Sequence, residues 1–131
     1  MKKFRCLVFI DDDYPTNYYH KIIAREAEIA EDLVFFQSAT EALDYLISVN
    51  DNDGASPEVI FLDINMPGMN GWEFIKAYEK KVSSQSSKIW MLSTSINPAD
   101  KALADINERI SGFLNKPLTV EIFNELREEY L

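Results

Sequence analysis

Residues 59–71 have the sequence VIFLDINMPGMNG, in which an apolar run ends on Asp63 and a turn-forming loop follows. The apolar run, residues 59–62, predicts a buried strand, because a short continuous run bounded by turn residues is typical of one. Pro67 and Gly68 do not continue a helix, so they predict a tight turn before the next helix. Asp63 should therefore be fixed at the edge of a sheet, although its position also suits an aspartate that only caps a helix or turn.

Three further segments of the sequence place polar side chains at or after the end of a predicted strand. They are residues 10–13 (IDDD), 91–94 (MLST) and 115–117 (NKP). In an open parallel sheet, the carboxyl ends of the strands meet at one crevice, which is the usual ligand site of such a fold. The sequence therefore predicts that three aspartates, a hydroxyl group and a lysine share one pocket.

Apolar runs and helix-capping residues alternate along the whole chain. Strands are predicted at residues 5–10, 33–37, 59–62, 88–92 and 112–115. Helices are predicted at residues 15–28, 38–49, 71–81, 98–110 and 119–130, with caps at Ser38, Asn97 and Thr119. Five strands alternating with five helices predict an α/β fold with a doubly wound five-stranded parallel sheet and helices on both faces. The loop at 51–57 is expected to be a solvated insertion.

The composition limits the classes of protein to consider. The chain has 131 residues, enough for one domain, and its 47% hydrophobic and 27% charged residues are ordinary for a folded protein. A net charge of −9 argues against direct nucleic-acid binding, which needs a basic patch. No apolar run approaches the length of a membrane span or a signal peptide, and Cys6 has no partner for an internal disulfide. We therefore expect a cytoplasmic protein without membrane insertion.

Asp11 and Asp12 follow the first predicted strand and, together with Asp63, form a cluster of carboxylates that repel one another. Two unit charges about 4 Å apart cost about 4 kcal/mol at an effective dielectric constant near 20. Such a cluster must bind a proton or a cation. Oxygen ligands favour Mg²⁺ or Mn²⁺, and one Cys and one His provide no competing ligand set for zinc. Asp13 is expected to face solvent or to cap the following helix.

Lys116 follows the fifth predicted strand, where it can pair with Asp63 and later with a phosphoryl oxygen. Its bond to Pro117 is a candidate cis peptide. Ser93, at the end of the fourth strand, offers a hydroxyl group to the same pocket, and Thr94 is the alternative for that role. Together with the acidic cluster, these groups indicate phosphoryl chemistry on a carboxylate, assisted by a divalent cation.

The order and spacing of these groups resemble those of the receiver domain of bacterial two-component response regulators. The resemblance covers essentially the whole chain and is greatest to stand-alone receivers similar in plan to the chemotaxis regulator. It implies a flavodoxin-like (βα)5 fold in a single receiver domain over residues 1–131, with no output domain.

The resemblance also implies roles for the residues of the pocket. Asp63 is the phosphoacceptor, and Lys116 grips the phosphoryl group. The implied ligands of the metal ion are Asp11, Asp12, Asp63 and the backbone carbonyl of Asn65, and the side chain of Asn65 is expected to flank the phosphoryl group. All of the groups that the chemistry needs are present, so a receiver that is not phosphorylated is not expected.

Further roles fall to residues that follow the fourth and fifth strands. Ser93 is implied to be the switch hydroxyl, and Phe113 falls at the aromatic switch position, where a permanently buried core aromatic is the alternative. The remaining flanking residues are Thr94, Ser95 and Pro117, of which Ser95 is expected to tune the lifetime of the phosphoryl group.

By this resemblance, the protein accepts a phosphoryl group from a sensor histidine kinase or a histidine phosphotransfer protein, with Mg²⁺ as cofactor and Mn²⁺ as a substitute. It then signals through a change in protein binding, removes the phosphoryl group slowly by itself, and is a signalling protein rather than an enzyme. Partners are expected to dock near residues 13–16 and 117–118, on a monomer or weak homodimer. A phosphorelay intermediate and a phosphate sink are alternative outputs.

Two other classes of protein share part of the pattern. A Mg²⁺-dependent aspartyl phosphatase also clusters acids, but it carries an Asp-x-Asp-x-Thr run, whereas residues 11–15 are DDDYP. A flavodoxin-like carrier of FMN shares the fold, but its phosphate loop is rich in Ser, Thr and Gly, and three aspartates would repel that phosphate. Both alternatives are therefore disfavoured.

Overall fold

The computed structural model describes residues 2–50, 56–82, 86–95 and 97–131, so most of the expected 51–57 insertion lies outside the described residues. The elements follow in the order β1 (Phe4–Ile10), α1 (Tyr14–Glu26), β2 (Ala30–Phe36), α2 (Ala39–Asn50), β3 (Val59–Asp63), α3 (Gly71–Lys81), β4 (Lys88–Ser93), α4 (Pro98–Asp105), β5 (Ile110–Asn115) and α5 (Val120–Tyr130). The strands form one parallel sheet in the order β2-β1-β3-β4-β5. The structure therefore confirms the predicted α/β fold.

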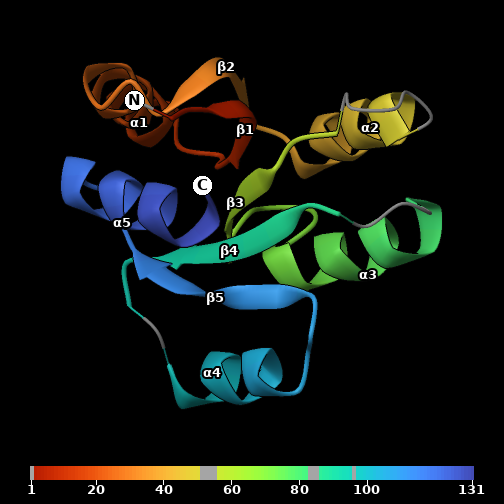
Figure 1. Cartoon of the computed structure of the whole chain (residues 1–131). Helices are drawn as coiled ribbons and strands as arrows, with labels where there is room; N and C mark the ends of the chain where they lie inside the picture. The colour runs from red at the N-terminus through yellow and green to blue at the C-terminus, as the bar shows by residue number, and fades with distance from the viewer. Residues whose placement is uncertain (1, 51–55, 83–85, 96) are drawn as a thin grey trace.

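Helices cover both faces of the sheet (Figure 1), with α1 and α5 on one face and α2 and α3 on the other. Alternate residues of β1 point to opposite faces: Leu7 and Phe9 pack in the core beneath α1 and α5, whereas Val8 and Ile10 pack in the core beneath α2 and α3. Because both faces are covered, the central strands are apolar at almost every position. Within the described residues, no helix has the length and apolar character needed to cross a membrane.

Aromatic rings dominate the core between the sheet and α5. Phe9 and Phe61, on neighbouring strands, stack with ring centroids 4.9 Å apart. Phe123 of α5 meets both rings edge-on, at 6.3 and 6.1 Å, and its side chain is completely buried. Stacked and edge-to-face pairs at these separations are favourable arrangements of aromatic rings. The α5 helix is therefore anchored directly to the strands that carry the acidic residues.

The α4 helix, in contrast, lies beyond β5 at the periphery of the molecule (Figure 1), and none of its residues, all of which the structure describes, is buried. Its first turn is capped by Asn97, whose side chain accepts a hydrogen bond from the N–H of Asp100. Trp72 of α3 donates from its indole Nε1 to Asp100 Oδ1 at 3.0 Å. The same indole meets the ring of Phe113 edge-on, with centroids 6.4 Å apart. A single side chain of α3 thus connects α4 with β5.

The prediction of a strand at 33–37 was wrong in its boundaries, because β2 begins three residues earlier and ends at Phe36. Asp32 pairs in register with Cys6 of β1, but its side chain, like that of Glu31, is exposed to solvent. An edge strand tolerates such charged residues and is protected by them from pairing with another chain. Because these charged residues interrupt the apolar run, the apolar pattern does not predict the first half of the strand.

The prediction of a helix over 98–110 was also wrong, because α4 ends at Asp105 and β5 already begins at Ile110. A turn centred on Asn107 separates the two elements: its N–H bonds to the carbonyl of Ala104, and its own carbonyl accepts from Ile110. Ile110 is buried and pairs with Ile89 of β4. A turn with an asparagine, rather than the expected stop near Gly112, ends the helix.

Gly112 of β5 lies directly against the indole of Trp90 on β4. A β-carbon at position 112 would come within 2.6 Å of the Trp90 ring, closer than such atoms approach in proteins. The indole also donates from Nε1 to the hydroxyl oxygen of Tyr130 at 3.2 Å. The missing side chain at Gly112 therefore leaves the space that the indole needs to reach α5.

Candidate functional site

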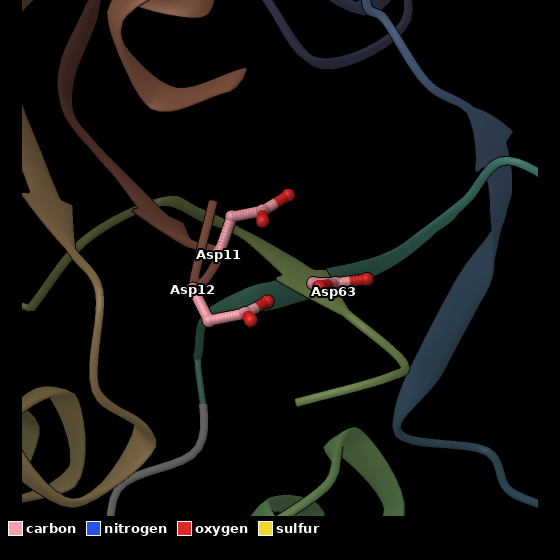
Figure 2. Close-up of side chains that lie close together, drawn as sticks. All are labelled: Asp11, Asp12 and Asp63. Atoms are coloured by element: carbon pink, nitrogen blue, oxygen red, sulfur yellow. The ribbon is translucent and has the colours of Figure 1, made fainter. Parts of the chain in front are cut away.

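The three predicted acids meet at the carboxyl ends of β1 and β3. Figure 2 shows the side chains of Asp11, Asp12 and Asp63 close together, and one oxygen of each lies within 4.8 Å of the others. Asp11 and Asp63 are buried, whereas Asp12 is exposed. Asp11 comes directly after β1 and Asp63 is the last residue of β3, so the backbone of the sheet fixes the spacing between their carboxylates.

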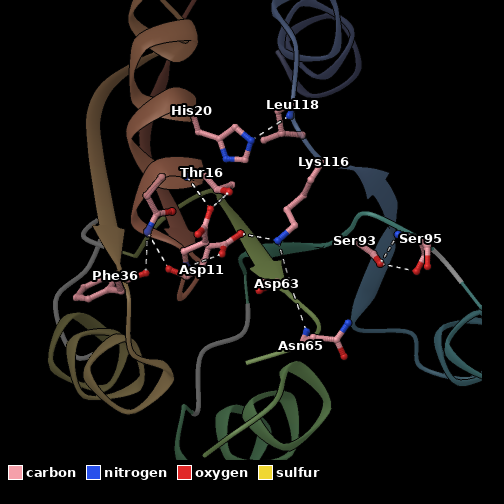
Figure 3. Close-up of polar contacts among 12 residues, drawn as sticks. Asp11, Thr16, His20, Phe36, Asp63, Asn65, Ser93, Ser95, Lys116 and Leu118 are labelled. Carbon is pink, nitrogen blue, oxygen red and sulfur yellow. Dashed lines mark hydrogen bonds and ion pairs between the residues drawn. The ribbon is translucent and has the colours of Figure 1, made fainter. Parts of the chain in front are cut away.

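Lys116 brings a positive charge into this cluster from the end of β5. Its Nζ lies 2.9 Å from Asp11 Oδ2 and 3.2 Å from Asp63 Oδ1 (Figure 3). The Lys116–Pro117 peptide bond is cis. Burial disfavours the ammonium, but the hydrogen bond and attraction to Asp11, with those to Asp63, outweigh it and raise the pKa of Lys116. Lys116 is therefore a fixed cation that bridges the two buried carboxylates.

The Asp63 carboxyl is electrostatically unusual. Burial and the negative charge of Asp11 raise its pKa to about 6, against the opposing effect of Lys116 and of the N–H of Asn65, which lies 3.4 Å from Oδ1. A carboxylate that is costly to ionise gains from any cation placed beside it. The site therefore favours binding of positive charge next to Asp63.

The loop between β3 and α3 brings the chain back against Asp63. Gly68 has a φ of +82°, which L side chains rarely adopt, and it completes the predicted turn. At Gly71, a β-carbon would come within 2.8 Å of the Asp63 carbonyl oxygen, so only glycine allows α3 to begin so close to β3. Asn70 and Glu73 form a reciprocal capping box at this helix start. The helix thus begins directly beneath the predicted phosphoacceptor.

The donor set fits a hard divalent cation. It consists of carboxylate oxygens from Asp11, Asp12 and Asp63 that lie within reach of a single ion. One ammonium among three ionised carboxylates leaves two net negative charges, which a divalent cation would neutralise. Within the described part of the chain, these are the grouped acids that could hold a metal ion, and they suit Mg²⁺ or Mn²⁺.

Other predicted site residues lie around this centre but make different contacts. The Ser93 hydroxyl donates to the carbonyl of Ser95 at 2.6 Å and accepts from its N–H at 3.1 Å, so it faces Ser95 rather than the carboxylates (Figure 3). The Asn65 side chain is exposed. Phe113 is partly buried beside Trp72, which fits neither a fully exposed ring nor a sealed core aromatic.

A cavity of about 550 Å³ opens next to the ammonium of Lys116. Its lining combines residues of the α1 start with the ends of β4 and β5, namely Asp13, Pro15, Thr16, Tyr19, Thr94, Lys116 and Pro117. Asp13 caps α1, as expected, by accepting from the N–H of Thr16. The flanking residues Thr94 and Pro117 therefore lie together with the docking segment predicted at 13–16.

Sequence reasoning missed two buried polar residues of α1 that support the site. Asn17 Nδ2 donates to the carbonyl of Asp11 at 2.9 Å and to that of Phe36 at 3.2 Å, which fixes the backbone that carries the acidic pair. His20 Nε2 accepts the N–H of Leu118 at 3.0 Å. Both lie on the face of α1 that also buries Ile23, and a polar residue on an apolar helix face is the signal that could have revealed them.

Solved structures similar to this chain share its architecture. A two component response regulator from Cytophaga hutchinsonii is 31% identical with a TM-score of 0.89, over 98% of this chain and 97% of that one. A two-component response regulator from Legionella pneumophila is 26% identical with a TM-score of 0.77, over 95% and 96%. A CheY-like receiver domain protein from Methanospirillum hungatei JF-1 is 27% identical with a TM-score of 0.73, over 92% and 89%.

The comparison with curated proteins finds no match. The profile of the response regulator receiver domain matches residues 7–127, a span that contains all the residues of the acidic cluster and the lysine that bridges them. With this match and the fold described above, the chain belongs to the family of response regulator receiver domains.

Proposed function

We propose that the protein accepts a phosphoryl group onto Asp63 from a phosphohistidine of a sensor histidine kinase or a histidine phosphotransfer protein. The observation that carries this proposal is the position of the Asp63 carboxylate, which is buried at the end of β3 and lies 3.2 Å from the Lys116 ammonium. A fixed acceptor beside a fixed cation suits phosphoryl transfer, because that reaction depends on positioning and on stabilisation of charge.

In the proposed reaction, an oxygen of the Asp63 carboxylate attacks phosphorus, and the phosphorus–nitrogen bond of the donor breaks. The electron pair of that bond stays on the imidazole nitrogen of the donor. Lys116 turns from Asp11 toward an oxygen of the incoming group, where its charge is needed. Mg²⁺ held by Asp11, Asp12, Asp63 and the carbonyl of Asn65 would supply charge neutralisation.

The phosphoryl group is removed by water. Attack on phosphorus releases inorganic phosphate and restores the Asp63 carboxylate, so the protein resets itself and turns over no other substrate. The exposed side chains of Asn65 and Ser95 border this site from two loops and are proposed to set how readily water enters.

The signal is proposed to travel from Ser93 to Phe113. On phosphorylation, the Ser93 hydroxyl leaves Ser95 and bonds to a phosphoryl oxygen, and the space that it vacates accepts the ring of Phe113. That ring contacts Trp72, which in turn holds α4. The α4–β5 surface would then have two conformations, and the bound phosphoryl group would change their proportions. A partner protein would bind one conformation in preference to the other.

The donor is proposed to dock over the cavity beside Lys116. This cavity lies between the start of α1 and Pro117 and provides an apolar approach to Lys116, bordered by Pro15, Tyr19 and Pro117. A phosphohistidine ring entering here would carry its phosphoryl group toward Asp63.

The test is phosphorylation by acetyl phosphate with Mg²⁺, followed by the mass of the intact protein. Wild type should gain one phosphoryl group, Asp63→Asn none, and omission of Mg²⁺ should suppress the gain. Asp13→Asn is the matched control, because Asp13 caps α1 outside the cluster and asparagine also caps helices. If no adduct accumulates, binding of beryllofluoride is measured next, and absence of both would refute the proposal.

A further inference from the structure

His20 links α1 to the segment that carries the catalytic lysine. Its side chain is completely buried, and its Nε2 accepts the N–H of Leu118, which lies almost a hundred positions later in the sequence, at 3.0 Å (Figure 3). Leu118 follows Lys116 by two residues and is itself fully buried. The bond therefore joins two elements that only the fold brings together.

Besides the burial of Leu118 in the core, backbone hydrogen bonds hold the segment from Lys116 to Leu118 in place. The N–H of Lys116 donates to the carbonyl of Ser93 at the end of β4, at 3.0 Å. Pro117 has no N–H to donate. The next donor is the N–H of Leu118, which is buried and would destabilise the fold if it were left without a partner. His20 supplies that partner, so β4 holds one end of the segment and α1 holds the other.

His20 is suited to accept this bond at ordinary pH. Burial, with a smaller contribution from the charge of Lys116, lowers its pKa to about 4. The imidazole is therefore neutral near pH 7, with its proton on Nδ1 and a lone pair on Nε2. The rings of Phe9 and Tyr19, with centroids 6.0 and 6.2 Å away, enclose it. Because the imidazole of His20 is neutral, it does not repel the ammonium of Lys116, which can pair with the carboxylates.

We propose that His20 is a positioning residue for phosphoryl transfer: by accepting the N–H of Leu118, it fixes the 116–118 segment and thereby holds the Lys116 ammonium between Asp11 and Asp63. His20 touches neither the donor nor the phosphoryl group. The inference rests on the proposed role of Lys116. A displacement of about 1 Å in such a group can lower the rate of a reaction by up to about 100-fold.

Two substitutions separate positioning from simple packing. His20→Leu fills the space but offers no acceptor, and His20→Gln carries an amide oxygen that can reach the same donor. With acetyl phosphate and saturating Mg²⁺, His20→Leu should be phosphorylated about 10-fold to 100-fold more slowly, and His20→Gln should recover most of the rate. Affinity for Mg²⁺ should not fall in either variant, because the acids stay at the ends of β1 and β3 and loss of the nearby ammonium leaves them more negative.

A double-mutant cycle with Lys116→Ala provides the decisive comparison. If His20 acts through Lys116, then His20→Leu should cause no further loss of rate in the Lys116→Ala background, whereas independent effects would add. An additive loss, or a His20→Gln rate as low as that of His20→Leu, would show that the ring only fills space. Should His20→Leu not fold, His20→Asn replaces it, since its shorter amide stops short of Leu118.

A second readout does not depend on phosphorylation. In His20→Leu, the NMR signal of the Lys116 Cε should move toward the value of a solvated lysine, and in His20→Gln it should stay near that of wild type. Unchanged Lys116 signals in His20→Leu would overturn the positioning role even if the receiver chemistry holds. Conversely, a wild type that neither is phosphorylated nor binds beryllofluoride, while the Lys116 signal moves in His20→Leu, would refute the proposed function but show that His20 still positions the Lys116 ammonium.

Discussion

The helices α1 and α4 are attached to the same sheet in opposite ways. The α1 helix buries Asn17, His20, Ile23 and Ala24. Asn17 donates a hydrogen bond to the carbonyl of Asp11, and His20 accepts one from the N–H of Leu118. The α4 helix, fully described, has no buried residue. Elements with few buried contacts open and shift at low free-energy cost, whereas packed elements do not. The side of the molecule around α1 is therefore expected to resist displacement, and the side around α4 is expected to shift at lower free-energy cost.

The α4 helix has a polar contact with α3 through the bond between Asp100 and Trp72. In the turn that follows the helix, Asn107 Nδ2 donates to Glu79 Oε1 at 3.5 Å, near the limit of a hydrogen bond. Leu103 and Ile106, next to a cavity of about 620 Å³ between α3 and α4, are 44% and 80% exposed. A helix with one partly buried apolar contact to the core, at Ala104, and otherwise exposed residues can change position with little opening of the core.

The largest expected effect comes from truncating the packed side. Phe123→Ala removes a fully buried ring from the cluster with Phe9 and Phe61 and should cost about 3–5 kcal/mol of unfolding free energy. The matched change on the other side, Leu103→Ala in α4, should cost only about 1 kcal/mol, because 44% of the side chain is already exposed. Urea unfolding measures both, and similar losses would erase the contrast between the two helices.

The pH dependence of stability should also originate on the α1 side. The folded pKa of His20 is about 4, below its usual value of 6.5, so the neutral ring stabilises the fold above pH 6.5 and this contribution is lost as the pH falls toward 4. The difference corresponds to about 3 kcal/mol. Comparing the unfolding free energies of wild type and His20→Gln from pH 7.5 to 4 isolates it. If the unfolding free energies of the two proteins changed with pH in parallel, the pH dependence could not be assigned to His20.

A smaller effect of pH on stability, of opposite sign, is expected from Asp63 at the carboxyl end of β3. Its folded pKa, about 6, lies above the usual 3.8, so the ionised carboxylate destabilises the fold once the pH rises through this range. Without divalent cations, Asp63→Asn should therefore be more stable than wild type at pH 7.5, by about 1–2 kcal/mol after allowance for partial solvent screening. Thermal unfolding measures the gain, which should vanish near pH 3.5. A less stable variant at pH 7.5 would mean that the pairing with Lys116 outweighs the repulsion.

The smallest expected loss of stability concerns the attachment of α4 to α3. Trp72→Phe keeps an aromatic ring beside Phe113 but removes the hydrogen bond to Asp100, at a cost of about 0.5–1 kcal/mol. Amide hydrogen exchange should become faster across α4 and remain unchanged in α1. Asp100→Asn, which keeps an acceptor for the indole, serves as the control. Equal acceleration in both helices would show that α4 is not an independent unit.

The fold was predictable from the sequence wherever burial was complete. The central strands at 59–62 and 5–10 are enclosed on both faces, so their residues form uninterrupted apolar runs, and the structure extends each by only one residue. The edge strand β2 and the end of α4 were harder to predict. At β2 the charges of Glu31 and Asp32 face solvent and mask the strand, and near Asn107 side-chain bonding to the N–H of Arg109 helps to form a turn that propensity alone does not reveal.

The candidate site was predictable to a similar degree. The meeting of Asp63 with Asp11, Asp12 and Lys116 follows from the rule that strand ends converge, and the geometry agrees with it. The bonding of Ser93 to Ser95 depends on a side-chain rotamer, which no sequence pattern specifies. The roles proposed for these residues remain to be tested by the experiments above.

Gly112 and Trp90 have a consequence for how the sequence can change over evolution. A β-carbon at position 112 would overlap the indole, and the φ of +159° there is one that residues other than glycine rarely adopt, so a smaller ring at position 90 removes only the first of these two obstacles. Loss of the ring at position 90, in contrast, creates space instead of a clash. Position 90 should therefore vary more readily than position 112, and a library that randomises both should return glycine at 112 with several different residues at 90.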